Sequence, residues 1–300
     1  ERPPRVLIVA NRLPVVAYRD GGEVGEKMMS SFYSKLQGQQ AKQAQTRQRS
    51  FGTQGLEQGQ QRWDPGPNSE FELEKNTKGL VAALGSVPTT SQMLWIGWAG
   101  LNDAKPTEEV ALRAELTTRD CIPVMLKDKS FSPYFDGMCN DVLWPLMHCC
   151  RPGLGDRSLH GYEAQWRAYV EVNKAFAAEV LQAYQPGDTV FVHDYHLMLV
   201  PKLLRAADAS MRIGWFCHIP FPPEQIWRAL PARRQLLEAM LSADLVGFHT
   251  KNDAKNFVNA VQRITGYAPR EKTGDGTING MAVVGGNIEG PTFGNGVDVR

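Results

Sequence analysis

Three short apolar runs organise the second half of the chain. They begin at residues 188, 212 and 243, and each is rich in β-branched and aromatic residues, ends in polar residues and leads into a helical pattern. Three successive strand–turn–helix units predict a parallel β-sheet. In an open α/β sheet the ligand crevice lies outside the carboxyl ends of the strands. We therefore expect Asp194, His218 and His249, which follow these runs, on the functional side of the sheet.

The remaining pattern extends the same architecture. Residues 5–10 form a continuous apolar run typical of a buried strand, and the runs at residues 93–98 and 121–126 predict two more strands. Helical spacing of apolar residues predicts helices at residues 106–118, 159–184 and 252–264, and a hairpin is expected around residues 277–284. The predicted fold class is α/β, a Rossmann-like parallel sheet with helices on both faces.

A stretch from about residue 21 to residue 74 breaks this pattern. Residues 37–61 hold many Gln residues together with Gly, Ser and Arg, and few large apolar side chains. Such a composition cannot bury enough apolar surface to offset the entropy lost on ordering. We predict a low-complexity surface insertion that is partly disordered, with a short helix near residues 27–36.

Composition and charge exclude several classes of function. The net charge of +1 gives no electrostatic case for binding nucleic acid or an anionic membrane. No apolar run approaches the roughly 18 residues that a membrane span needs, and the N-terminal residues do not have the pattern of a signal peptide. The five cysteines lack the spacing of a disulfide framework. We interpret them as reduced thiols in a cytoplasmic protein.

Two polar residues at predicted strand ends are open to two interpretations each. Arg12 follows the first strand, where its guanidinium could hold a phosphate in a bidentate way or form a salt bridge with a neighbouring loop. Asp194 could bind the hydroxyl groups of a sugar, or it could cap a helix that starts at Tyr195. Position alone does not separate these alternatives.

Other candidate features give weaker signals. The aromatic-rich residues 131–148 could form a wall for a sugar ring, although such clusters are more often core. Residues 77–85 resemble a turn into a helix, whose free amides could bind a phosphate or could be an ordinary helix start. The histidines at positions 193, 196, 218 and 249 lack the spacing of a zinc or metalloprotease motif, so we expect no metal.

The chain closely resembles trehalose-6-phosphate synthases, which are retaining GT-B glycosyltransferases that join UDP-glucose to glucose 6-phosphate. The resemblance rests on seven stretches in family order that cover nearly the whole chain outside the Gln-rich region. They are Val9-Ala-Asn-Arg-Leu-Pro-Val15, Gly79-Leu-Val-Ala-Ala-Leu84, Trp95-Ile-Gly-Trp-Ala-Gly100, Asp136-Gly-Met-Cys-Asn-Asp-Val-Leu-Trp-Pro-Leu146, His193-Asp-Tyr-His-Leu197, Trp215-Phe-Cys-His-Ile-Pro-Phe-Pro222 and Ala243-Asp-Leu-Val-Gly-Phe-His-Thr250.

The resemblance implies roles for individual residues. Arg12 matches the arginine that holds the phosphate of glucose 6-phosphate, and Trp144 matches the aromatic residue beside that phosphate. Asp194 matches the carboxylate that binds the acceptor hydroxyls, and His218 matches a histidine near the transferred glucose. Asp194 and His218 are thus the implied catalytic pair. Gly79 falls in a loop that lies against the donor UDP-glucose in the family.

Two residues depart from the family pattern. Lys78 stands where the family usually has the first glycine of Gly-Gly-Leu, so a side chain occupies a position of close backbone approach to the donor. Phe135 stands where the family has the phosphate-contacting tyrosine, and it lacks the hydroxyl. Losing one hydrogen bond to a charged group costs roughly 1.5–3 kcal/mol, which corresponds to more than a tenfold loss of acceptor affinity.

We therefore expect residues 1–300 to be the N-terminal, acceptor-side half of a GT-B fold, with the UDP-glucose-binding domain absent and the chain inactive alone. The complete protein would transfer glucose from UDP-glucose to glucose 6-phosphate in trehalose biosynthesis, without a cofactor. Its partners would be these two substrates, and a homo-oligomer or a trehalose-synthesis complex stays open. One alternative is a catalytically inactive, synthase-like regulatory subunit, and another is a Rossmann-type metal hydrolase that uses the histidines.

Overall fold

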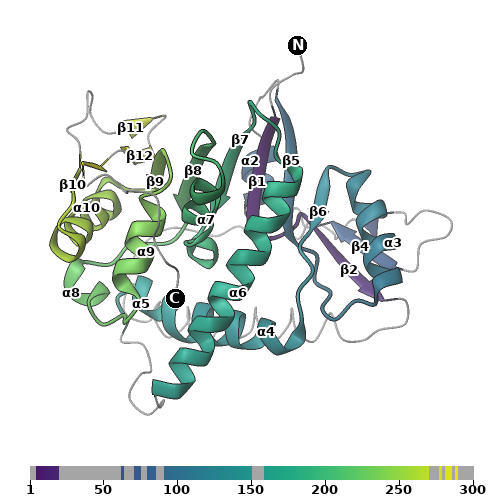
Figure 1. Ribbon diagram of the computed structural model, residues 1–300, viewed down its shortest axis with the longest axis horizontal. Coiled ribbons are helices and arrows are strands. Elements are labelled where there is room, and N and C mark those ends of the chain that lie inside the picture. Colours follow the sequence, from purple (N-terminus) through teal and green to yellow (C-terminus); the bar gives the residue numbers. More distant parts are fainter. Residues whose placement is uncertain are drawn as a thin grey trace, which may run out of the picture.

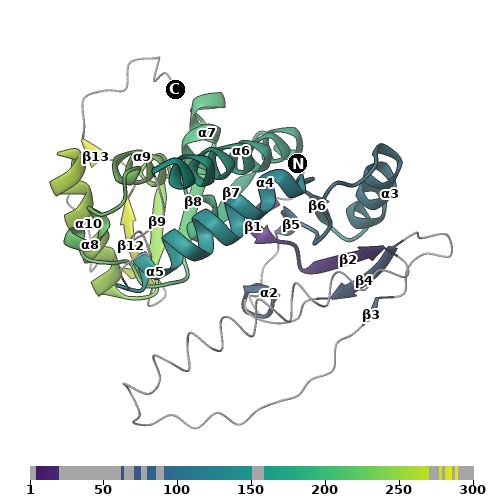
Figure 2. The ribbon, with the colours of Figure 1, turned by 90° about the horizontal axis from the view of Figure 1, so that it is seen from below.

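An eight-stranded sheet crosses the molecule, and helices cover both of its faces (Figure 1 and Figure 2). The computed structural model describes residues 5–19, 62–63, 71–75, 80–85, 91–150, 159–269, 277–278, 281–285 and 288–289. This architecture confirms the α/β, Rossmann-like fold expected from the sequence.

Six strands of the sheet are parallel, and their order in space differs from their order in the chain. In chain order they are β1 (Arg5–Arg12), β5 (Gln92–Trp98), β6 (Cys121–Pro123), β7 (Thr189–His193), β8 (Arg212–Cys217) and β9 (Leu245–Phe248). In space the order is β6-β5-β1-β7-β8-β9, so the winding reverses between β1 and β7. Such a switch point is where open α/β sheets place their ligands.

The far edge of the sheet is antiparallel. Strand β12 (Met281–Gly285) pairs with β9, and β11 (Thr277–Ile278) pairs with β12. This pairing confirms the hairpin expected around residues 277–284. Two further short strands, β10 (Ala268–Pro269) and β13 (Ile288–Glu289), pair with each other outside the main sheet.

Strand β1 is buried on both faces, which explains its continuous apolar run. Leu7 and Val9 belong to the core on one face, whereas Ile8 belongs to the core on the other. All three side chains are at most 2% exposed. A strand with two buried faces has no position at which water favours a polar side chain, so its sequence does not alternate.

The helices divide between the two faces. The larger core lies under η1, a π-helix, together with α6, α7, α9 and α10, whereas α2 and α3 pack on the opposite face. Their bounds are α2 (Leu80–Gly85), α3 (Pro106–Thr117), α4 (Asp128–Ser132), η1 (Pro133–Leu143), α5 (Trp144–Met147), α6 (Leu159–Ala183), α7 (Val200–Ala207), α8 (Glu224–Trp227), α9 (Arg233–Met240) and α10 (Lys251–Thr265).

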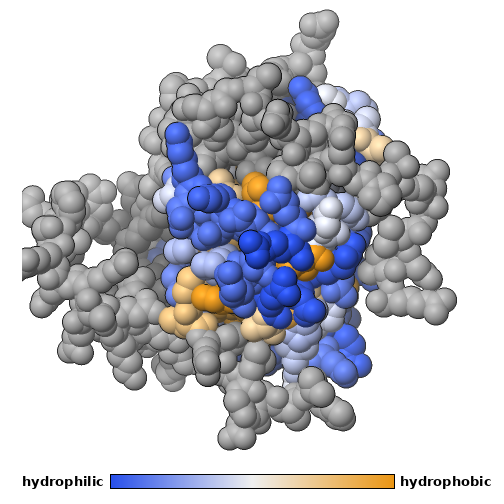
Figure 3. Space-filling view, turned by 90° about the vertical axis from the view of Figure 1, so that its left-hand side faces the viewer, coloured by the Kyte–Doolittle hydropathy of each residue, from blue (hydrophilic) through white to orange (hydrophobic). Residues whose placement is uncertain are grey.

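Helix α10 shows how local sequence sets an element. Its first turn is capped by Thr250, whose hydroxyl accepts a hydrogen bond from the backbone N–H of Asp253 at 3.1 Å. It ends at Gly266, which adopts a left-handed conformation with φ 79°. The inner face buries Phe257 and Val261. The outer face is polar, and most of the coloured residues at this end of the molecule are hydrophilic in Figure 3.

A second, three-stranded sheet packs beside the main one. Strand β2 (Val15–Arg19) pairs antiparallel with β4 (Phe71–Lys75), which pairs with β3 (Arg62–Trp63). Phe71 and Leu73 are 2–3% exposed and join the core under β1 and β5. Residues 71–74 are therefore part of a packed sheet, although we expected them to lie in the surface insertion. The predicted helix near residues 27–36 lies outside the described residues.

Candidate functional site at the carboxyl edge

The candidate site lies where the carboxyl ends of β1, β7 and β8 meet. Strands β1 and β7 are neighbours, as are β7 and β8, and all run in the same direction. Their ends therefore bring Arg12, Asp194 and His218 to one edge of the sheet. His249, which follows β9, is on the same edge, with its ring centroid 5.6 Å from that of His218. The sequence pattern placed all four residues on this side.

Arg12 lies at an irregular end of β1. The pairing of β1 with β5 shifts register between Val9 and Arg12. A Cβ built on Gly97 would approach the Ala10 carbonyl oxygen to 2.7 Å and the Arg12 backbone carbon to 2.9 Å. Because glycine has no Cβ, the end of β1 can pass this close to the backbone of β5.

Two aromatic rings contact the Arg12 guanidinium. Its Cζ lies 4.8 Å from the ring centroid of Trp98 and 5.5 Å from that of Phe135. Contacts at these distances are cation–π interactions. They orient a guanidinium at the switch point, which is the arrangement that an anion clamp requires.

Phe135 is a support for Arg12 within the structure. Its side chain is 5% exposed and stacks on Phe131 and His196, with ring centroids 5.3 Å and 6.0 Å away. Trp144 is half-buried, with its ring 5.9 Å from that of Tyr195. The aromatic-rich stretch is thus mainly core, the more common of the two interpretations, and Trp144 is only partly buried.

Asp194 has a strained backbone. Its φ of 72° and ψ of 173° lie in a region that is essentially restricted to glycine. Its side chain makes no capping hydrogen bond, and the following turn is a 3₁₀ turn, Tyr195–Leu197, instead of the α-helix expected to start at Tyr195. The capping interpretation is therefore wrong, and strain retained at a strand end is typical of functional residues.

Burial raises the pKa of Asp194 to about 6, although the backbone N–H groups of Tyr195 and His218 lower it. Its carboxylate Oδ1 accepts a hydrogen bond from the His218 N–H at 3.3 Å. The carboxylate is therefore ionised at neutral pH and can accept hydrogen bonds from ligand hydroxyl groups.

His196 is a half-buried neutral imidazole beside Asp194, with its Nδ1 atom buried. Its Nδ1 lies 4.0 Å from Asp194 Oδ2 and makes no hydrogen bond within the described residues. Burial, and then the charge of Arg12, lower the pKa of His196 to about 3. The sequence analysis considered this residue only as one of four histidines without metal-ligand spacing.

Two residues of α6 hold the turn after β7, and the sequence analysis missed their role. The Tyr169 hydroxyl donates to the Tyr195 carbonyl at 2.7 Å and accepts from the Met198 N–H at 3.1 Å. Asn173 Nδ2 donates to the His196 carbonyl at 3.1 Å, and the Leu199 N–H donates to Asn173 Oδ1 at 3.1 Å. The available signal was Asn173 itself, a polar residue on the buried face of a helix.

The turn after β8 is held in a similar way by α10. The Phe221 N–H donates to Asp253 Oδ1 at 2.9 Å, and Asn256 Nδ2 donates to the Phe221 carbonyl at 2.9 Å. The two turns that carry Asp194 and His218 are thus each fixed by polar side chains of a packed helix. A site fixed in this way is preorganised.

Two expected donor-binding residues, Lys78 and Gly79, lie outside the described residues. Among the residues that are described, no group of three or more His, Cys, Asp or Glu side chains is arranged to hold a metal ion. No helix in the described ranges is both long and apolar enough to cross a membrane.

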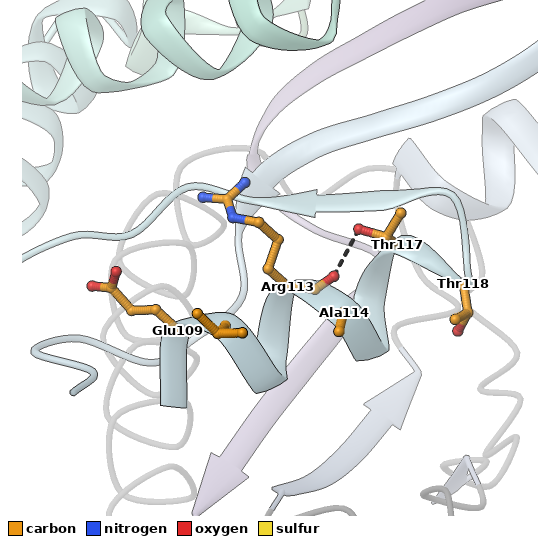
Figure 4. Close-up of a pocket in the computed structure, with 6 residues that line it drawn as sticks. Glu109, Arg113, Ala114, Thr117 and Thr118 are labelled. Carbon is orange, nitrogen blue, oxygen red and sulfur yellow. Dashed lines mark hydrogen bonds between the residues drawn. The ribbon is translucent and has the colours of Figure 1, made fainter. Parts of the chain in front are cut away.

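A hollow of about 530 Å³ lies elsewhere, along α3 (Figure 4). It is lined by Glu109, Val110, Arg113, Ala114, Thr117 and Thr118. Its polar groups are already engaged, since Arg113 pairs with Glu179 through two hydrogen bonds and the Thr117 hydroxyl donates to the Arg113 carbonyl at 2.7 Å. The convergent polar groups of the carboxyl edge make that edge the better candidate.

The sheet order defines a Rossmann-like α/β fold, which the chain shares with the OtsA apo structure at TM-score 0.56 and 23% identity. The chain belongs to glycosyltransferase family 20, whose sequence pattern matches residues 57–288.

Individual relatives agree with this family. The chain is 36% identical over 296 residues to alpha,alpha-trehalose-phosphate synthase [UDP-forming] 1 of Arabidopsis thaliana, covering 98% of this chain and 26% of that protein. It is similar to the E. coli trehalose-6-phosphate structure bound with UDP-2-fluoro glucose, with TM-score 0.53, 29% identity and coverage of 65% of this chain and 42% of that one.

A further structure shares the fold. It is a trehalose-phosphate synthase from Burkholderia xenovorans in complex with glucose-6-phosphate, with TM-score 0.57, 22% identity and coverage of 93% of this chain and 48% of that one. The chain thus spans about a quarter of the Arabidopsis protein and less than half of the two solved structures.

Proposed function

We propose that this chain is the acceptor-side half of a UDP-forming α,α-trehalose-phosphate synthase, which transfers glucose from UDP-glucose to glucose 6-phosphate. One observation carries the proposal: Arg12 and Asp194 lie at the ends of two adjacent strands at the switch point of the sheet. The guanidinium supplies a clamp for a phosphate, and the carboxylate supplies an acceptor for sugar hydroxyl groups. The relatives with synthase names and the complex with glucose-6-phosphate support this choice of substrates.

The proposed chemistry depends on positioning. Arg12 holds the acceptor phosphate, Asp194 orients the acceptor hydroxyl groups, Trp144 lies beside the phosphate, and His218 lies near the transferred glucose. Lys78 and Gly79 contact the donor. Transfer with retention then proceeds on one face of the donor sugar, with the departing phosphate assisting removal of the proton from the incoming hydroxyl. The rate enhancement comes from orientation and charge stabilisation, and independence of cofactors and metals stays a prediction.

The second half of the catalytic cleft belongs to a further domain in this proposal. The 300-residue chain would bind the acceptor and would not catalyse transfer alone. We place the protein in the cytoplasm, where cysteines are kept reduced. Assembly into a homo-oligomer or a trehalose-synthesis complex is part of the same proposal.

The test uses the longest natural protein that contains this chain. UDP release from UDP-glucose should depend on glucose 6-phosphate. Arg12→Ala should raise the KM for glucose 6-phosphate by at least about tenfold, since a charged hydrogen-bond pair to phosphate is lost. Arg234→Ala is the matched control, because this exposed arginine of α9 contacts Glu238 and the carbonyls of Ile264 and Thr265 and none of the candidate site residues. An unchanged KM in Arg12→Ala would show that Arg12 does not clamp the phosphate.

The second candidate function is a synthase-like regulatory subunit without activity. Phe135 favours it, because a phenylalanine that is 5% exposed cannot supply the hydrogen bond of the family tyrosine. A folded protein that binds glucose 6-phosphate in calorimetry but releases no UDP would establish this function. Acceptor-dependent UDP release would rule it out.

A further inference from the structure

Two histidines from adjacent strand ends share one hydrogen bond. Nδ1 of His193, the last residue of β7, lies 2.9 Å from Nε2 of His218, the first residue after β8. The rings are nearly parallel, with an interplanar angle of 28°. A bond between two ring nitrogens needs one donor and one acceptor, so it fixes the tautomers of both rings together.

His193 is enclosed, whereas His218 is not. The side chain of His193 is 2% exposed, and His218 is half-buried at the carboxyl edge. Phe191 contacts the His193 ring edge-on, with centroids 4.2 Å apart. A Cβ on Gly214, in the next strand, would lie 3.0 Å from the Phe191 ring. The glycine therefore leaves space for Phe191 beside the His193 ring.

The burial of His193 decides the direction of the shared bond. Its other nitrogen, Nε2, is buried and has no hydrogen-bond partner within the described residues. A proton on Nε2 would be an orphaned buried N–H, which folded proteins avoid more strictly than an unfilled acceptor. The proton of His193 therefore lies on Nδ1, which donates to Nε2 of His218.

This direction leaves His218 with its proton on Nδ1. Burial, and then the charge of His249, lower the pKa of His218 to about 4, so the ring is neutral near pH 7. Nδ1 of His218 makes no hydrogen bond within the described residues. It is thus an available neutral donor at the edge where ligands are expected to bind.

We propose that His193 is a positioning residue that holds His218 as its Nδ1–H tautomer, so that His218 donates a hydrogen bond to an oxygen of the bound sugar or of its leaving group. The inference about the tautomer rests on the geometry of the two rings. The inference about the sugar oxygen rests on the function proposed above.

The tautomer can be read directly by long-range ¹H–¹⁵N NMR of the histidine-labelled 300-residue chain at pH 7. The chain has only six histidines, and single substitutions assign them. We expect His218 with a protonated Nδ1 and an unprotonated Nε2, and His193 with the same pattern. A proton on Nε2 of His218 in the unsubstituted protein would overturn the proposal.

Three variants separate donation from packing. His193→Asn keeps a donor near the Nδ1 position, and it should keep the His218 tautomer. His193→Gln moves the amide toward the Nε2 position, and His193→Leu removes it, so both should give a mixture of His218 tautomers. Phe191→Leu is the packing control, because it alters a ring against His193 and leaves the donor, and it should not change His218.

Activity gives the second measurement, in the longest natural protein that contains the chain. His193→Gln should lower kcat by about tenfold or more with little change in KM, because a donor in the transition state is lost, and His193→Asn should retain most of it. An unchanged His218 tautomer in both His193→Gln and His193→Leu would overturn the proposal. Absence of UDP release in the unsubstituted protein would instead contradict the proposed function and leave the tautomer result standing.

Discussion

The carboxylate of Asp194 accepts a hydrogen bond from the backbone N–H of His218, with 3.3 Å between Oδ1 and N. The N–H of Asp194 donates in turn to the carbonyl of Phe216 at 2.7 Å. Asp194 is therefore linked to the end of β8 through its side chain and through its backbone. Because the side-chain contact uses the backbone of residue 218, Asp194→Ala removes it, whereas a substitution of the His218 side chain leaves it in place.

The raised pKa of Asp194 predicts an unusual dependence of stability on pH. Burial moves the pKa from its ordinary 3.8 to about 6, so the folded state binds more protons than the unfolded state between about pH 4 and 6. The free energy of unfolding should therefore fall as pH rises through this window. Asp194→Asn removes the effect, and it should be more stable than the unsubstituted chain at pH 7 by up to about 3 kcal/mol, with no difference near pH 4.

Urea denaturation of both proteins at pH 4 and pH 7 measures this difference. Asp208→Asn is a control of opposite sign, because hydrogen bonds from Ser210 lower the pKa of Asp208. Asp208 contributes stability above its ordinary pKa that is lost as pH falls, so Asp208→Asn should be less stable at pH 7. An equal pH profile for Asp194→Asn and the unsubstituted chain would show that Asp194 is not held in a desolvated environment.

The backbone conformation of Asp194 predicts that glycine is more stabilising than alanine at this position, the reverse of the usual order. Glycine ordinarily costs stability relative to alanine because it loses more freedom on folding. At φ 72° and ψ 173° the Cβ is the source of strain, so Asp194→Gly should be more stable than Asp194→Ala by about 1–3 kcal/mol. Both variants lack the carboxylate, so their difference isolates the backbone. Denaturation of the pair at pH 7 gives the value, and a more stable alanine variant would contradict the strain.

Gly97 predicts a link between packing and the Arg12 site. A Cβ there would meet only backbone atoms, at 2.7 Å from Ala10 O and 2.9 Å from the Arg12 backbone carbon, and backbone cannot swing aside. Gly97→Ala should cost about 1–3 kcal/mol of stability and should weaken phosphate binding by displacing Arg12.

A second glycine supplies the control for this substitution. Gly161 lies in α6, and a Cβ there has no atom within 4 Å. Gly161→Ala should stabilise the protein by about 0.5–1 kcal/mol through helix propensity alone. Thermal denaturation compares the two variants, and calorimetry with glucose 6-phosphate reports the site. If Gly97→Ala were as harmless as Gly161→Ala, β1 would not need the close approach.

The sequence predicted which residues reach the carboxyl edge but not how they are held there. Strand position follows from apolar runs, so Arg12, Asp194, His218 and His249 could be placed from the pattern alone. The cation–π contacts of Arg12 come from Trp98 and Phe135, which are far from Arg12 in the chain. The sequence around Arg12 therefore does not predict them.

Other features of the site also depend on distant segments. Asp194 follows an apolar run and precedes a helical pattern, which favours a helix start, yet hydrogen bonds from Tyr169 and Asn173 hold the next residues in a different turn. The strand Phe71–Lys75 was missed because its apolar residues are few and its partner β2 is more than fifty residues earlier. Contacts between distant segments determine both the turn after Asp194 and the strand Phe71–Lys75. The local sequence pattern contains no information about such contacts.

The opposite end of the sheet carries a buried ion pair that should be costly to break on one side only. Asp188 is fully buried, and its carboxylate accepts from Arg5 Nε at 3.2 Å, from Arg5 Nη2 at 2.6 Å and from the Gln185 N–H at 2.8 Å. Asp188→Ala leaves the Arg5 charge without its partner next to the core, and it should lower the free energy of unfolding by about 3–5 kcal/mol. The double variant Asp188→Leu with Arg5→Met replaces both charges by apolar groups, and it should recover much of that loss.

Because the pair lies at the amino ends of β1 and β7, away from Arg12 and Asp194, affinity for glucose 6-phosphate measured below the unfolding transition should change by less than about twofold in either variant. Chemical denaturation of the single and double variants gives the coupling energy. If the double variant were no more stable than Asp188→Ala, the stability lost in Asp188→Ala would come from side-chain packing and from the hydrogen bond with the Gln185 N–H, and not from the unpaired charge of Arg5.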